Sequence, residues 1–131
     1  MKIMKNKFLQ IFLLMTISFA ANAQQRVPGF PQIADIGTYL GECRGKFIVY
    51  TLTYIELGQK DTADSLKYMQ QLTDSLSRKY VADSRYYDQI SAQEIKRFGP
   101  MARGHAGGGA QQAIAELNQC IKFVGEVKKM N

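Results

Sequence analysis

Apolar residues recur at intervals of four, three, four, three and four positions between residues 36 and 54 of this chain of 131 residues. A period of about 3.5 is typical of a helix that buries one continuous face, whereas the side chains of a strand alternate at every second residue. The stripe consists of Ile36, Leu40, Cys43, Phe47, Tyr50 and Tyr54. A second set, Ile48, Leu52 and Ile55, predicts a wider buried face, so we expect this helix to lie against several neighbours. The β-branched residues of segment 47–55 leave a strand open as the alternative there.

Two other segments have the pattern of amphipathic helices. Gly58 is typical of a helix end, and Asp61 can cap the helix that follows, which we expect at about residues 61–80. The apolar side of that helix contains Leu66, Met69, Leu72, Leu76 and Tyr80. The last helix is predicted from about residue 110 to residue 129, where its basic end suits the negative end of a helix dipole. Its predicted buried side contains Ile114, Leu117, Ile121 and Val124.

The chain between these two helices has a weaker pattern. Residues 81–98 carry apolar side chains at helical spacing, but Ser91 and Glu94 form a capping box that would start a new helix at Ser91. The sequence leaves open whether this stretch is one helix or two. Residues 99–109 hold five of the 11 glycines and a proline, which predicts a loop.

The first 23 residues have the features of a signal peptide that is removed on export. Three lysines precede an apolar run over residues 8–20, and the small residues of 21–23 suit cleavage before Gln24. Even residues 8–23 number only 16, fewer than the roughly 20 that a membrane-spanning helix requires. We therefore expect a single helical domain, residues 24–131, that works in the periplasm or outside the cell with no stable membrane insertion.

The two cysteines are expected to form a disulfide, since exported domains fold in an oxidising compartment. In an up-down bundle the first and last helices are antiparallel neighbours. Cys43 and Cys120 then lie at similar heights, because they are 11 and 9 residues from the adjacent helix ends that we expect. The sequence thus predicts an all-α fold, an antiparallel up-down bundle of about four helices, with one disulfide between Cys43 and Cys120. Closing so long a loop is worth roughly 4.5 kcal/mol in the chain-entropy model.

Composition and spacing argue against several classes of function. Without the leader the chain has 14 basic and 11 acidic residues, and a net charge of +3 is too small for a nucleic-acid-binding surface. One His and two Cys are too few for a His-rich metal site or a full zinc-finger set, and no metal or cofactor is expected. The glycine-rich segment 104–109 lacks the lysine of a phosphate loop, and no serine nucleophile motif accompanies His105. We interpret this segment as a connector and expect no enzymatic activity.

We expect instead a protein that binds another protein. Tyrosine is frequent at interfaces, because it joins a large apolar area to a polar end. The candidates for the contact surface are Tyr68, Tyr86, Tyr87, Lys96, Arg97 and Arg103. In plan the chain resembles small exported helical proteins with one disulfide, such as immunity proteins and periplasmic acid-stress chaperones, and this resemblance rests on architecture alone. The leading hypothesis is an inhibitor or immunity-type protein, the alternative is a stress chaperone, and the oligomeric state is open.

Mass spectrometry of the exported protein tests the leader and the disulfide together. The mature chain is expected to begin at Gln24, and its mass should rise by two hydrogens on reduction, because the thiols of Cys43 and Cys120 are joined. Two thiols that react with an alkylating reagent in the unreduced, denatured protein would contradict the disulfide.

Overall fold

A computed structural model of the protein describes residues 25–104 and 109–131, and these residues form four α-helices. The helices are α2 (Ile36–Glu56), α3 (Lys60–Ser77), α4 (Ser84–Ala102) and α5 (Gly109–Lys129). The predicted all-α fold is confirmed, and segment 47–55 is helical. The predicted signal peptide and positions 105–108 of the glycine-rich segment, with His105, lie outside the described residues. Within the described part of the chain, no helix combines the length and the apolar character needed to cross a membrane.

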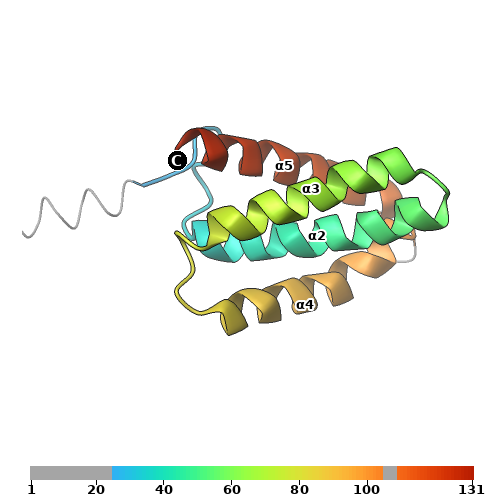
Figure 1. The fold of residues 1–131 in the computed structure, drawn as a ribbon, viewed down its shortest axis with the longest axis horizontal. Coiled ribbons are helices and arrows are strands. Elements are labelled where there is room, and N and C mark those ends of the chain that lie inside the picture. Colours follow the sequence, from blue (N-terminus) through green and yellow to red (C-terminus); the bar gives the residue numbers. More distant parts are fainter. Residues whose placement is uncertain (1–24, 105–108) are drawn as a thin grey trace, which may run out of the picture.

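The helices run alternately up and down, and α2 lies between the other three (Figure 1). α2 packs against α3, α4 and α5, whereas α3 and α4 barely touch. This central position explains the stripe predicted from the sequence, since Leu40, Cys43 and Phe47 have no exposed surface. The wider apolar face is a wrong prediction, because Leu52 and Ile55 are 56% and 48% exposed. The side of α2 that meets α4 is formed by buried glycines instead of large apolar residues.

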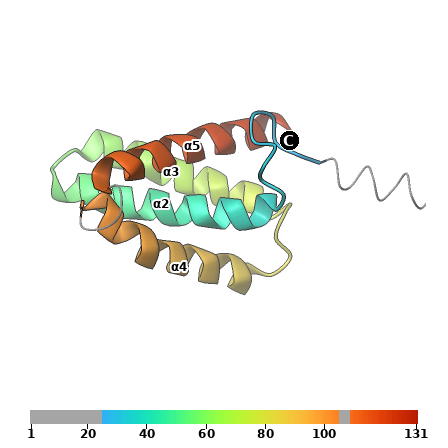
Figure 2. The same cartoon turned by 180° about the vertical axis from the view of Figure 1, so that it is seen from behind.

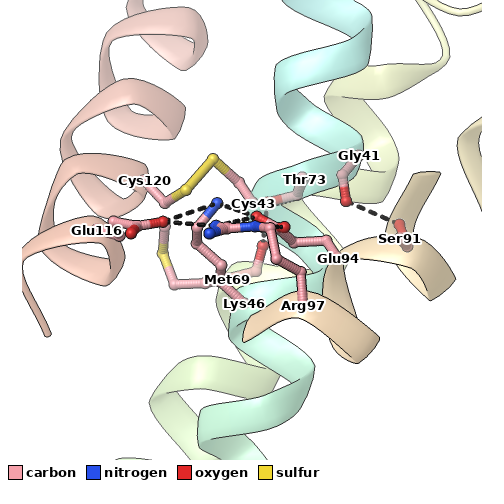
Figure 3. The surroundings of a disulfide bond; sticks show 10 residues. All are labelled: Gly41, Cys43, Lys46, Met69, Thr73, Ser91, Glu94, Arg97, Glu116 and Cys120. Atoms are coloured by element: carbon pink, nitrogen blue, oxygen red, sulfur yellow. Dashed lines mark hydrogen bonds and ion pairs between the residues drawn. A yellow bond between two sulfur atoms is a disulfide. The ribbon is translucent and has the colours of Figure 1, made fainter. Parts of the chain in front are cut away.

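The predicted disulfide between Cys43 and Cys120 is confirmed. It joins the middle of α2 to α5, with 5.3 Å between the two Cα atoms and neither cysteine exposed (Figure 3). The bond also sets the rotation of α5, because Cys120 has to face α2. The residues of α5 that share this side are therefore buried, namely Ala113, Leu117, Phe123, Val124 and Val127. Ile114 and Ile121, which the sequence pattern placed on the buried side, are exposed.

Several helix boundaries differ from those predicted. α3 begins at Lys60, so Asp61 lies in its first turn and not at its cap, where its charge still suits the positive end of the helix dipole. α3 ends at Ser77 instead of residue 80, because the chain already turns toward α4 there. α4 continues through Pro100 to Ala102, so the loop predicted from residue 99 is shorter.

α4 is one continuous helix, which answers the question left open for residues 81–98. Its N-terminus is capped by Asp83, whose carboxylate accepts a hydrogen bond from the backbone N–H of Arg85. The capping box at Ser91 and Glu94 is a wrong interpretation. Both side chains are buried and bind to α2, so the tertiary structure uses their polar groups and no helix start is needed there.

The contact between α2 and α4 depends on glycines spaced one helical turn apart. A Cβ atom at Gly41 would lie 3.0 Å from Cγ2 of Ile90, and one at Gly45 would lie 2.8 Å from the carbonyl oxygen of Ser91. The absence of side chains lets the two helices approach closely, and the Ser91 hydroxyl donates a hydrogen bond of 2.9 Å to the Gly41 carbonyl. Gly37 repeats the spacing one turn earlier, where a Cβ atom would meet the carbonyl oxygen of Tyr80 at 2.7 Å.

An alanine at Gly45 is expected to push α4 away from α2. The new methyl group meets backbone and the Cβ of Glu94, so we expect Gly45→Ala to lower the free energy of unfolding by about 1–3 kcal/mol in spite of the better helix propensity of alanine. Gly125→Ala in α5 is the matched control, because nothing lies within 4 Å of the added Cβ, and it should raise stability by up to about 1 kcal/mol. Urea unfolding measures both, and equal effects of the two substitutions would contradict the close contact.

Candidate functional site

α4 and α5 converge at the end where the chain connects them and diverge toward the other end, with α2 between them (Figure 2). Two hollows occur here, one of about 490 Å³ between α2 and α4 and one of about 390 Å³ between α2, α4 and α5. Glu42 and Arg97 line both, so we consider the hollows together and call them the groove. The other walls include Thr38, Tyr86, Ile90 and Gln93 in the first hollow, and Tyr39, Lys46, Glu116 and Gln119 in the second.

A buried ion pair lies beneath the groove. The Lys46 ammonium group of α2 donates a hydrogen bond of 2.5 Å to Oε2 of Glu94 on α4, and the two side chains are only 4% and 6% exposed. The rings of Phe98 and Tyr39 flank the ammonium group, with centroids 5.6 and 5.9 Å from Nζ. Such a pair is costly to break, because either partner alone would be a buried charge without a counterion.

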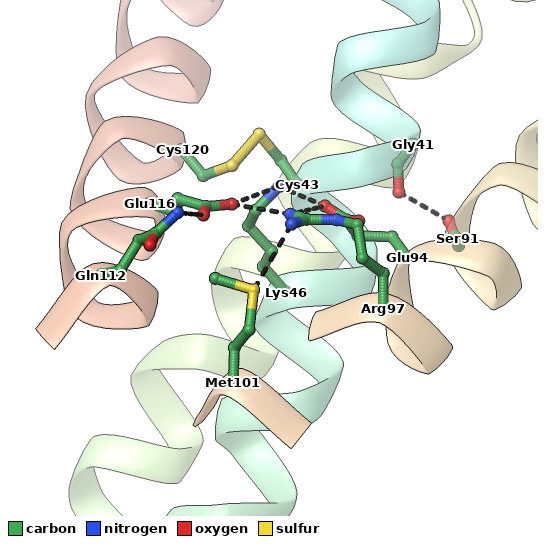
Figure 4. A network of polar contacts seen from close by, with 10 residues as sticks. All are labelled: Gly41, Cys43, Lys46, Ser91, Glu94, Arg97, Met101, Gln112, Glu116 and Cys120. Carbon is green, nitrogen blue, oxygen red and sulfur yellow. Dashed lines mark hydrogen bonds and ion pairs between the residues drawn. A yellow bond between two sulfur atoms is a disulfide. The ribbon is translucent and has the colours of Figure 1, made fainter. Parts of the chain in front are cut away.

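Arg97 crosses the groove from α4 to α5 (Figure 4). Its Nε and Nη2 atoms donate hydrogen bonds of 2.5 and 3.0 Å to the carboxylate of Glu94, and Nη2 also donates one of 2.7 Å to Glu116. The remaining nitrogen, Nη1, lies 3.4 Å from the sulfur of Met101. The bond to Glu116 ties α4 to α5 close to the point where the Cys43–Cys120 disulfide ties α2 to α5 (Figure 4).

The pKa values of Glu94 and Arg97 are both shifted in the direction that favours the ionised form. Burial alone would raise the pKa of Glu94, but the hydrogen bonds from Arg97 and Lys46 outweigh burial and lower that pKa below its ordinary value. The same bond to Glu94 raises the pKa of Arg97. Both groups therefore stay ionised over the whole neutral range.

Glu42 differs from the other charged residues of the groove. Within the described residues its carboxylate has no hydrogen-bond or ion-pair partner. Burial raises the pKa of Glu42; the positive charges of Lys46 and Arg97 act to lower it, and the negative charges of Glu94 and Glu116 oppose them. Burial also raises the pKa of the Tyr39 hydroxyl, as do the charges of the carboxylates around it. The region of Glu42 and Tyr39 thus has an excess of negative charge.

The residues predicted to contact a partner lie in different places. Tyr86 lines the first hollow, with its hydroxyl 3.0 Å from that of Thr38, and Arg97 lines both hollows. Tyr87 is buried and donates a hydrogen bond to Asp74 on α3, so the prediction that it lies on the surface is wrong. Tyr68, Lys96 and Arg103 are exposed but line neither hollow.

Ion pairing of Arg97 reduces the positive charge of the predicted cluster of Lys96, Arg97 and Arg103. The charge of Arg97 is balanced by Glu94 and Glu116, so this residue adds no open positive charge to the surface. Sequence reasoning missed Glu42, Lys46, Glu94 and Glu116 as groove residues. One signal was present in Lys46, a charged residue between Gly45 and Phe47 in the most apolar helix.

The described part of the chain brings few metal-ligating side chains together. It contains no group of three or more His, Cys, Asp or Glu side chains that could hold a metal ion. Lys46, Glu94, Arg97 and Glu116 are paired with one another, which leaves Glu42 as the carboxylate of the groove without an ion-pair partner among the described residues. The arrangement presents a charged surface on which both cations are paired with carboxylates.

Comparison with known proteins adds no functional assignment. No family model, curated protein or solved structure matches the chain. The geometry and the charges of the groove are therefore the basis for assigning a function.

Removing one member of the buried Lys46–Glu94 pair should destabilise the fold more than removing both. Lys46→Met leaves the Glu94 carboxylate with Arg97 alone, and we expect it to lower the free energy of unfolding at pH 7 by about 3 kcal/mol. In the double variant Lys46→Met, Glu94→Leu no charge is left behind at these two positions, so part of that loss should be recovered.

The difference between Lys46→Met and the wild type should also depend on pH. Because the pKa of Glu94 is lowered in the folded protein, its contribution to stability is present above its ordinary pKa of 4.5 and is lost as the pH falls through the folded-state value. Chemical unfolding at pH 7 and pH 3 should therefore show a smaller difference between Lys46→Met and the wild type at pH 3. A double variant as unstable as the single one would contradict this account.

Proposed function

We propose that this protein is an exported, non-catalytic binding protein of the inhibitor or immunity type, and that the groove on α2, α4 and α5 receives a segment of its protein partner. The observation that carries the proposal is a pair of adjoining hollows over a network of ion pairs that is already complete. A surface held in one shape before binding loses little conformational entropy when a partner binds.

The composition of the groove favours a polar protein segment as its occupant. Small-molecule sites are lined mainly by apolar and aromatic residues with a few polar groups. The groove is more polar, because apart from Ile90, Ala115 and two tyrosines its lining residues have charged, amide or hydroxyl side chains. Tyr86 and Tyr39 add the aromatic surface that is frequent at protein interfaces.

Export is the second part of the proposal. It is supported by the signal-like leader of the sequence and by the disulfide, since such bonds persist mainly in oxidising compartments. The periplasm or the external medium is accordingly the place where we expect the partner.

One observation favours the alternative, a stress chaperone. Leu52, Ile55 and Leu57, at the C-terminal end of α2, are 56%, 48% and 63% exposed. Exposed apolar side chains of this size can bind unfolded clients. They lie on none of the walls of the groove, so the two functions can be separated by position.

Site-specific photocrosslinking in the producing cell tests the proposal. A photoreactive residue replaces Gln93 in the groove, Leu52 at the apolar end of α2, or Gln71 on the exposed side of α3 as the control. We expect one discrete, stoichiometric adduct from position 93 and none from position 71, because a rigid groove selects one partner.

The other results have equally definite meanings. Many weak adducts from position 52 and none from position 93 would favour the chaperone. An absence of adducts at position 93, with or without labelling elsewhere, would contradict the groove as a binding site.

A further inference from the structure

We propose that Glu42 receives a lysine or arginine side chain of the partner, so that the groove recognises a cationic side chain. This inference rests on the proposed function and identifies the chemistry that the groove selects. It follows from the position of Glu42, which lies on the wall shared by both hollows and is therefore reached from either side of Arg97.

The groove has more negatively charged than positively charged side chains. Its two cations, Lys46 and Arg97, are neutralised by Glu94 and Glu116 through contacts of 2.5 to 3.9 Å. Glu42 is the remaining carboxylate of the lining, and among the described residues it has neither a hydrogen-bond nor an ion-pair partner. One added positive charge near Glu42 would make the positive and negative charges of the groove equal in number.

An anion bound by Arg97 is the opposite possibility, and the geometry is unfavourable for it. Two of the three guanidinium nitrogens already donate to carboxylates, and the third faces the sulfur of Met101. An anion would have to displace Glu94 or Glu116, and it would approach three carboxylates. A cation displaces nothing.

The surroundings of Glu42 also suit a cation. Tyr86 lines the first hollow and Tyr39 the second, and the face of an aromatic ring attracts an ammonium or guanidinium group. The side-chain amide of Gln93 adds an oxygen acceptor at the wall of the first hollow. Carboxylate, amide and ring together are the groups that recognise a lysine or arginine side chain.

The test is a titration of the full mature, disulfide-bonded protein, followed by the NMR shifts of its backbone amides. The probes are a decapeptide of alternating lysine and serine, the same peptide with glutamine in place of lysine, and n-butylamine as a free amine. We expect the lysine peptide to shift the amides of groove residues in a saturable manner and the glutamine peptide to have no effect.

Glu42→Gln and Glu56→Gln form a matched pair of variants. Each removes one negative charge from α2, but Glu56 is exposed at the end of the helix and lies outside the groove. The loss of a charge-assisted bond should weaken binding of the lysine peptide about tenfold in Glu42→Gln, with no comparable loss in Glu56→Gln.

The thermal stability of Glu42→Gln distinguishes a loss of peptide recognition from a loss of the folded structure. Burial raises the pKa of Glu42, so the ionised form is disfavoured in the folded protein and its contribution to stability decreases as the pH rises through that pKa. Glu42→Gln should therefore have a Tm at pH 7 equal to or above that of the wild type, which differs from the result expected for a residue with a structural role.

Each further outcome decides the inference. Equal binding of the lysine peptide by Glu42→Gln and the wild type, shifts spread over the whole surface, or no binding at millimolar peptide would overturn it. Saturation by n-butylamine at the concentration needed for the peptide would also overturn it, in favour of a small amine. In all these cases a discrete adduct at position 93 would leave the proposed binding function intact.

Discussion

The close contact between α2 and α4 is the constraint on which the rest of the structure depends. Without side chains at Gly41 and Gly45, the backbone of α4 comes near enough for Ser91 to bind the Gly41 carbonyl and for Glu94 to reach Lys46. Because α4 is held against α2 along this line, it diverges from α5 away from the connecting loop (Figure 2). The two hollows of the groove adjoin this contact, and Glu42 of α2 and Arg97 of α4 line both.

Two kinds of bond, a disulfide and ion pairs, connect the helices around the groove. The Cys43–Cys120 bond joins α2 to α5 covalently, the Arg97–Glu116 ion pair joins α4 to α5, and the Lys46–Glu94 ion pair joins α2 to α4. All three helices around the groove are thus connected, and the charges of Lys46 and Arg97 are neutralised within the network. A carboxylate left without a partner in such a network lowers stability slightly, which is a common property of sites that keep a group available for binding.

Much of the fold follows from short-range patterns. The stripe from Ile36 to Tyr54 is continuous over five turns and identifies α2 as the central helix, since only a helix of this period buries one face throughout. The cysteines then identify α5 as the antiparallel neighbour of α2, because a disulfide requires similar heights. The groove was only partly foreseen: Tyr86 and Arg97 line it, whereas Tyr87 is buried and Tyr68, Lys96 and Arg103 lie elsewhere.

Helix content, helix order and the cysteine pairing could be read from the order of residues, because each depends on periodicity or on a rule about oxidising compartments. The rotation of α5, the glycine contact and the charged groove were decided by packing in three dimensions. Ser91 and Glu94 show why. Their spacing suits a helix start, yet Ser91 bonds the backbone of α2 and Glu94 bonds the Lys46 side chain of α2, about 50 residues away in sequence. A local pattern cannot indicate which distant backbone a polar side chain will meet, and that meeting determines whether the side chain caps a helix, pairs a buried charge or lines a site.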